Sequence, residues 1–183
     1  MEPEELRERL PPEVKERMMR ENWHAHDARW FLKVGVECGF DVANKLNIAT
    51  VKSMGKTEMK RMLEAMQISG AENAEDFAKL AAIACETFFA PQMLEAETTE
   101  TGVDSMKAII RKCFVFEEVK KAGVVGTYEC ACGCRHEGWL EGCGLEGEVK
   151  ILRSMMKGAP FCEIEVSSIA RRADTEAGEE TTL

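Results

Sequence analysis

The residues best suited to chemistry form a run of three thiols and one imidazole. Cys130, Cys132, Cys134 and His136 stand at alternate positions of the chain. Thiolate and imidazole are the ligands that Zn²⁺ prefers, and they also suit iron or an iron–sulfur cluster. The run therefore predicts a metal centre, with zinc as the first expectation and iron as the alternative.

A regular helix would not bring all four of these groups to one ion. Residues four apart share a helix face, so Cys130 would pair with Cys134, and Cys132 with His136. A distant residue must complete either pair. The candidates are Cys162, which alternates with apolar residues on a predicted strand, Cys143 in a glycine-rich loop, and then Cys113.

Two other uses of the thiols stay open. Free cysteine is often a small buried hydrophobic residue, and this role suits Cys38 and Cys85, each alone on a predicted helix. Redox exchange within the run is the other alternative, although the usual C-x-x-C spacing is absent. A chain of 183 residues with 45% hydrophobic residues has no need of disulfides for stability.

A second candidate site lies on the first long predicted helix, where histidine and tryptophan are concentrated. Trp23, Asp27 and Trp30 fall along one stripe, with His26 beside them. This spacing favours a pocket with aromatic walls, into which His26 and Asp27 project as acid and base. We expect Trp23, Trp30 and the distant Cys113 to line the pocket. The alternative is that the tryptophans are core residues and Asp27 forms an ion pair.

The first half of the chain has the periodicity of helices. Pro11 and Pro12 open a predicted helix that ends at Gly39, and Asp41 is a candidate cap for a second helix that runs to about residue 66. A third helix is expected over about 72–89, before Pro91. Short connections predict three antiparallel helices in a bundle-like half.

The second half changes to the period-two alternation of strands. Strands are expected at 94–99 and 106–118, a short cysteine-bearing helix at about 126–140, and a hairpin formed by 149–156 and 161–167. These elements predict an α+β protein with an N-terminal antiparallel helical half and a C-terminal antiparallel sheet. We divide the chain into a helical half at 1–90, a ligand-binding-like half at 91–169 and a polar tail at 170–183.

Charge and hydropathy limit the partners. The net charge is -9 and neither half is basic, so a nucleic-acid partner is not expected. No apolar run reaches the roughly 18 residues of a membrane span, and the acidic N-terminus differs from a secretory signal. We therefore expect a cytoplasmic protein with no membrane partner. For a structural subunit we expect a homodimer formed through a sheet edge or the helical half.

Two regions of the chain, one in each half, resemble known families. Residues 23–39 follow the pattern W-x-x-H-D-x-x-W-F-x-x-V-x-x-x-x-G, and the next helix contains Gly55, Lys56 and Arg61. This region is similar to proteins related to 2-aminothiazoline-4-carboxylate hydrolases. The second half, with Trp139–Gly142 and Gly158–Cys162, resembles the vinyl-reductase-type ligand-binding domain.

The resemblance implies a cavity between helices and sheet, a small organic ligand, and cysteines able to hold a metal. Carried over by position, it points to His26, Asp27, Cys134 and Cys162. Three functions follow as expectations. The first is a metal-binding protein that holds a small organic ligand, and the second is a hydrolase of a cyclic C–N bond that uses metal-bound water or a thiolate with His26 and Asp27. The third is a structural subunit with buried free cysteines.

Overall fold

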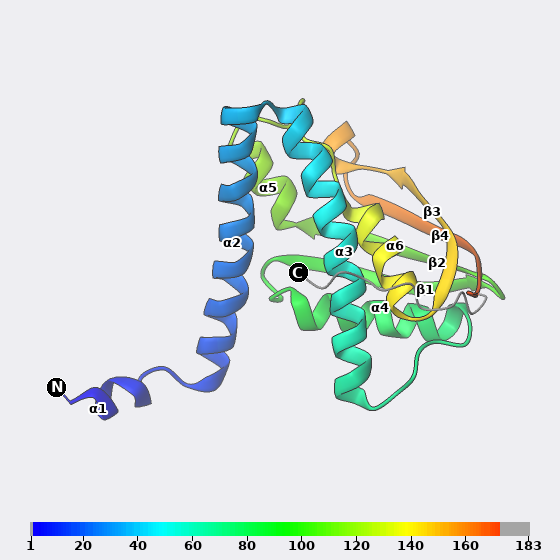
Figure 1. Cartoon of the computed structure of the whole chain (residues 1–183), viewed down its shortest axis with the longest axis horizontal. Helices are drawn as coiled ribbons and strands as arrows, with labels where there is room; N and C mark the ends of the chain where they lie inside the picture. Colours follow the sequence, from blue (N-terminus) through cyan, green and yellow to red (C-terminus); the bar gives the residue numbers. More distant parts are fainter. Residues whose placement is uncertain (1, 173–183) are drawn as a thin grey trace.

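The computed structural model describes residues 2–172, which form six α-helices and a four-stranded antiparallel sheet (Figure 1). The predicted α+β class, with helices first and the sheet last, is confirmed. The helices are α1 (Pro3–Glu8), α2 (Pro12–Cys38), α3 (Phe40–Met66), α4 (Ala74–Phe88), α5 (Phe114–Lys121) and α6 (Cys132–Gly142). The strands are β1 (Leu94–Gly102), β2 (Ser105–Cys113), β3 (Leu145–Arg153) and β4 (Cys162–Arg171), with a 3-10 turn at Met155–Lys157.

The ends of the first long helices follow from proline and glycine. Pro12 occupies the first turn of α2, where its missing N–H costs nothing. Gly39 separates α2 from α3 with a φ of 91°, a backbone conformation that side chains rarely adopt. The predicted break at Gly39 is confirmed. The expected cap at Asp41 is wrong, because α3 already begins at Phe40 and Gly39 takes the cap position.

The sheet has the strand order β1-β2-β4-β3. The strand expected to continue to residue 118 ends at Cys113, where β2 meets the first residue of β1, and β4 begins still earlier, opposite Ile110. Beyond Cys113, no strand within residues 2–172 lies on either side to accept backbone hydrogen bonds. The chain satisfies its backbone N–H and C=O groups internally by forming α5. The strand predicted from the alternation of residues 114–118 is therefore wrong.

The observed bounds of the helix and strands around the cysteine run also differ from the predicted bounds. The helix expected from residue 126 begins at Cys132, because turns occupy Val124–Tyr128. The predicted hairpin is present but longer than expected, and its turn closes at Gly158 with a φ of 86°. Ala170 and Arg171 belong to β4, and the predicted polar tail from residue 173 onward lies outside the described residues.

The helices do not form a three-helix bundle. Helices α2 and α3 run side by side, but α4 crosses behind the lower half of α3, and α3 packs most extensively against α6 from the other half (Figure 1). Glycines make this contact close: a Cβ on Gly138 would lie 2.2 Å from the Lys52 carbonyl oxygen, and one on Gly55 2.6 Å from the Arg135 carbonyl oxygen. Because glycine has no side chain at these positions, α6, with its thiols and imidazole, packs directly against α3.

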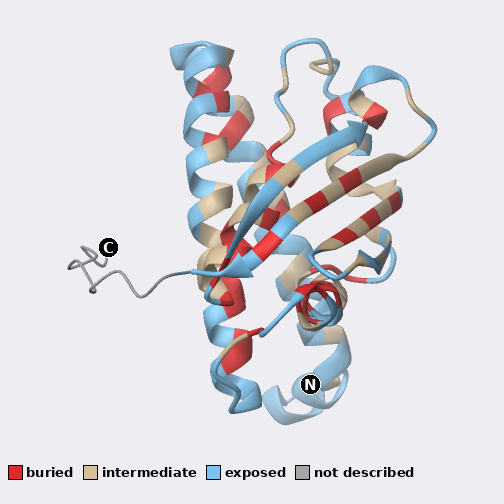
Figure 2. Ribbon diagram, turned by 90° about the vertical axis from the view of Figure 1, so that its right-hand side faces the viewer, coloured by how far each residue is buried: buried red, intermediate tan, exposed pale blue. Residues whose placement is uncertain are grey.

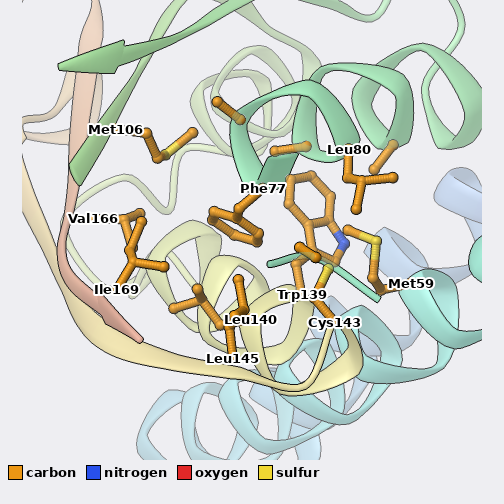
Figure 3. Close-up of a cluster of buried hydrophobic side chains, with 14 of the residues drawn as sticks. Met59, Phe77, Leu80, Met106, Trp139, Leu140, Cys143, Leu145, Val166 and Ile169 are labelled. Atoms are coloured by element: carbon orange, nitrogen blue, oxygen red, sulfur yellow. The ribbon is translucent and has the colours of Figure 1, made fainter. Parts of the chain in front are cut away.

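The core lies between the sheet and helices α3, α4 and α6. Trp139 and Phe77 lie at its centre, both almost completely buried (Figure 3). Buried residues alternate along the inner strands, whereas β3 is mostly exposed (Figure 2). The outward positions carry ion pairs such as Lys107–Glu163, with 3.0 Å between nitrogen and oxygen. One face of the sheet is thus covered by helices and the other is charged.

Among the helices within residues 2–172, none combines the length and the apolar character that crossing a bilayer requires.

Candidate functional site

A cavity of about 710 Å³ lies where α2, α3, the end of α4, the end of β2, α5 and the start of α6 meet. Its size is within the roughly 300–1,000 Å³ typical of small-molecule sites. Most of its wall is apolar or aromatic, and that wall includes Ala28, Phe31, Leu32, Val51, Phe89, Met93, Leu94, Ile110, Phe114, Val119, Tyr128 and Trp139. Both the helical half and the sheet contribute residues to this wall.

One cation in this wall is held by a buried carboxylate. The Arg135 guanidinium donates to Glu58 across 2.7 Å, and the Trp139 indole N–H donates to the other oxygen of Glu58 across 3.0 Å. Glu58 is only 5% exposed, and Arg135 also lies over the Phe89 ring at 5.0 Å. The ion pair therefore fixes the position of a charged group in a mainly apolar wall.

His24 is packed into an aromatic corner of the cavity. Its ring stacks on Phe89 at 5.0 Å and meets Phe114 at 4.6 Å, and its Nε2 lies 3.1 Å from the Phe88 carbonyl oxygen. That oxygen can only accept, so Nε2 carries the proton. Burial lowers the pKa of His24 below its usual value, which keeps the ring neutral at pH 7.

His136, on α6, is a buried imidazole with one unsatisfied nitrogen. Its Nδ1 lies 2.9 Å from the Cys132 carbonyl oxygen and must donate to it. This bond leaves Nε2 unprotonated, and that atom is buried without a hydrogen-bond partner among the described residues. Burial also lowers the pKa of His136. A donor group supplied by a bound molecule would satisfy this nitrogen.

The two buried histidines predict a specific pH dependence of stability. Because their pKa values are lower in the folded state, the unfolded chain binds more protons once the pH falls below the ordinary value of about 6.5. The free energy of unfolding should therefore fall as the pH drops from 7 to 5, by up to about 1.4 kcal/mol per pH unit for each histidine. Urea titrations of the wild type, His24→Gln and His136→Gln at several pH values measure this slope.

Each of these two variants should have a flatter dependence than the wild type. His26→Gln, on the exposed side of α2, serves as the control and should keep the wild-type slope. An equal slope in all four proteins would show that the buried imidazoles do not titrate on unfolding.

Four thiols line the cavity, and all eight cysteines of the chain are free. Burial raises the pKa of Cys130 to about 11 and that of Cys85 to about 11. It also raises the pKa of Cys113, and raises that of Cys132 well above the usual range. These thiols are therefore protonated and poorly nucleophilic at neutral pH.

The residues predicted to bind a metal are only partly brought together. Cys130, Cys132 and His136 line the cavity, whereas Cys134 does not. Cys162 lies on β4, outside the cavity lining, and its sulfur accepts the Met155 N–H across 3.3 Å. As the side chains stand, residues 2–172 contain no group of three histidine, cysteine, aspartate or glutamate side chains placed to hold a metal ion.

The predicted acid–base residues and tryptophans are divided by the helical period. At 100° per residue, α2 turns His24, Asp27 and Phe31 toward the cavity. His26, Trp23 and Trp30 do not line it. Both tryptophans are largely exposed, at 56% and 43%. The structure therefore supports neither of the two roles predicted for them, in the wall of the pocket or in the core. Cys113 lies in the cavity wall.

Sequence analysis missed the polar groups that organise the cavity. Glu58 and Arg135 had no distinguishing motif, although a lone glutamate beside Met59, in an otherwise apolar helix stripe, is the kind of residue that needs a buried partner. Asn44 was also missed. It accepts the Glu129 N–H across 3.0 Å and donates to the Thr127 carbonyl oxygen across 2.6 Å, and so holds the loop that leads to Cys130.

The fold and site together define an α+β protein with an apolar cavity between its helices and its sheet. Comparison with protein-family models gives no match, and no curated protein matches the chain.

Proposed function

We propose that the protein binds a small, mainly apolar organic molecule in the cavity between α2, α6 and the sheet. The cavity itself carries this proposal: it has a volume of about 710 Å³, an apolar and aromatic wall, and few polar groups. Such a combination is typical of ligand sites, in which apolar area supplies affinity and a few fixed polar groups supply orientation.

The polar groups indicate how the ligand is oriented. Arg135 presents a guanidinium already held by Glu58, which suits an acidic or hydrogen-bond-accepting end of a ligand. The neighbouring His136 offers an unprotonated Nε2 to a hydrogen-bond donor. Both residues lie on one turn of α6, so one end of a ligand can meet both while its apolar body contacts Phe31, Phe89 and Val119.

The hydrolase hypothesis has less support in the geometry. It requires His26 and Asp27 to act on the same molecule, and only Asp27 lines the cavity. The thiols that would serve as nucleophiles are held in their protonated form by burial, because burial raises the pKa of both Cys130 and Cys132. Ligand binding needs neither group to react.

Filling the cavity should weaken ligand binding. Ala28 lies in the wall on α2, so the indole of Ala28→Trp would occupy the space. Anilinonaphthalene sulfonate, an apolar dye with one anionic group, is a suitable probe, and its affinity should fall at least about tenfold in the variant, which corresponds to about 1.4 kcal/mol. Fluorescence titration with the dye measures the change.

The matched control is Val36→Trp, which adds the same side chain to the same helix at a position that is 74% exposed. Its affinity for the dye should equal that of the wild type. Equal binding by both variants would place the dye on the protein surface and contradict the proposed cavity site.

A further inference from the structure

The outer side of α2 carries exposed residues that lie in one line along the helix. These residues form the outer stripe of α2, which consists of Met19, Trp23, His26 and Trp30. At 100° per residue, all four side chains fall within about 60° of one another around the helix axis. The buried residues of α2 lie on the other side. The outer stripe therefore faces away from the core, on the helix that forms one edge of the molecule (Figure 1).

The spacing and composition of the outer stripe suit a contact between two helices. Its members follow one another after four, three and four residues, which is the spacing of the seam in a pair of helices packed side by side. Tryptophan and methionine are enriched in protein interfaces, whereas the solvent side of a helix usually carries charged and polar residues. Exposed apolar side chains gathered in this way indicate an interaction surface.

Opposite charges flank the two ends of the outer stripe. Glu16 precedes it by three residues and Lys33 follows it by three residues, and both are exposed. The Glu16 carboxylate contacts Arg20 on its own helix, but its side chain is still 60% exposed and a carboxylate accepts from more than one donor. The stripe thus has a negative group at one end and a positive group at the other.

These charges favour a second copy of α2 in the antiparallel direction. With a two-fold axis between Trp23 and His26, Glu16 of each copy lies opposite Lys33 of the other, so that the dimer contains two pairs of opposite charge. A parallel pair would place each of these residues opposite its own copy and so bring like charges together. Charge complementarity therefore selects both the occupant of the surface and its direction.

The same axis matches the outer stripe with itself. Trp30 of one copy meets Met19 of the other, and Trp23 meets His26, so each stripe covers the whole of its partner. Such a two-fold contact uses the same surface on both copies and closes after two of them. The expected assembly is a dimer and not a filament.

Helix α1 also suits a neighbour on this side of the molecule. It is six residues long, none of Pro3–Glu8 is buried, and it extends from the start of α2 away from the sheet (Figure 1). So short a helix gains little stability from its own hydrogen bonds and depends on packing. Leu6 and Leu10 are both exposed. In the antiparallel pair, the start of α2 lies beside the end of the partner's α2, where the partner can cover these two leucines.

We propose that two copies of this chain form a dimer through the outer stripes of their antiparallel α2 helices. The four residues of the stripe do not line the cavity, so the dimer is independent of the proposed function. Each tryptophan is large enough to bury about 150–250 Å². Tryptophan is also among the residues that contribute most to the affinity of protein interfaces.

Substitutions in the stripe test whether it forms the contact. Sedimentation equilibrium of the full chain should show a monomer–dimer equilibrium with a dissociation constant of about 10 μM or below. Trp23→Glu and Trp30→Glu should each weaken dimerisation by about 100-fold or more, because each change places two carboxylates in the dimer contact. Both tryptophans are exposed in the single chain, so the variants should keep the wild-type circular dichroism. The matched control is Val103→Glu, at a position that is 93% exposed in the turn between β1 and β2, and it should dimerise as the wild type does.

Charge reversals test the antiparallel direction. Glu16→Lys and Lys33→Glu should each weaken dimerisation by about tenfold at low salt, because each creates two pairs of like charge. The double variant restores two opposite pairs and should recover most of the wild-type affinity. A parallel dimer would keep like charges opposed in all four proteins, so equal dissociation constants would overturn the proposal. A wild-type chain that stays monomeric, or a Trp23→Glu variant that dimerises as tightly as the wild type, would overturn it as well.

Discussion

Gly138→Ala should lower the free energy of unfolding by roughly 3–5 kcal/mol, the largest effect expected of any single methyl group in this protein. The added Cβ would lie 2.2 Å from the Lys52 carbonyl oxygen and 2.9 Å from the Lys56 backbone nitrogen. Both obstacles are backbone atoms of a long helix and cannot turn aside. Helix α6 would have to move away from α3, and urea denaturation measures the cost.

Gly133→Ala is the matched control for this prediction. Gly133 is also buried and also lies in α6, but the nearest atom to its Cβ would be Ile151 Cδ1 at 3.6 Å, an ordinary contact. Alanine is the better helix former, so this variant should keep or gain stability, by up to about 1 kcal/mol. If both variants lost the same stability, the close contact of α6 with α3 would not be the cause.

Sequence patterns predicted helix ends correctly where these ends depend only on nearby residues. The break at Gly39 and the proline start of α2 depend on backbone freedom within a few residues, and both were correct. The strand expected past Cys113 failed for the opposite reason. Whether a backbone can remain extended depends on its neighbours, and the starts of β1 and β4 decide that position.

The same sequence patterns could not predict which helices pack against one another. Gly55 and Gly138 look like helix-weakening residues when read singly, and their role is visible only when α3 and α6 are placed together. The bundle-like half was predicted from short connections, which say nothing about α6. Since α6 carries Cys132 and His136, the sequence could identify these residues as candidate ligands but could not locate the cavity wall that they share.

For the candidate site, too, the residue types were informative and the arrangement in space was not. Residue type identified Cys130, Cys132 and His136 as candidate metal ligands, and the structure places all three in the cavity wall without grouping them around an ion. The helical period of α2 was predicted, but the tryptophans Trp23 and Trp30 that were expected to face the pocket are exposed instead. The side of α2 that faces inward depends on the positions of Phe89 and Tyr128, which contact His24 and Phe31, respectively.

Arg135→Met should destabilise the protein by about 3–5 kcal/mol, because it leaves a buried carboxylate without its cation. Glu58 is 5% exposed, and in the variant the Trp139 indole N–H would still donate to it. Adding Glu58→Gln removes the unpaired charge and keeps an oxygen that can accept from Trp139. The double variant should therefore recover about 2 kcal/mol or more relative to Arg135→Met. Urea denaturation of the two single variants and the double variant gives the coupling energy.

The control for this cycle is an arginine with an exposed partner. Arg111 contacts Glu97 across 2.8 Å on the charged face of the sheet, and both side chains are about half exposed or more. Arg111→Met should cost no more than about 1 kcal/mol, because solvent screens the pair. If Arg135→Met were as mild as Arg111→Met, or if the double variant recovered nothing, Glu58 would not hold Arg135 by charge. The cation could then reorient freely, and the fixed orientation that we propose for the ligand would lose its basis.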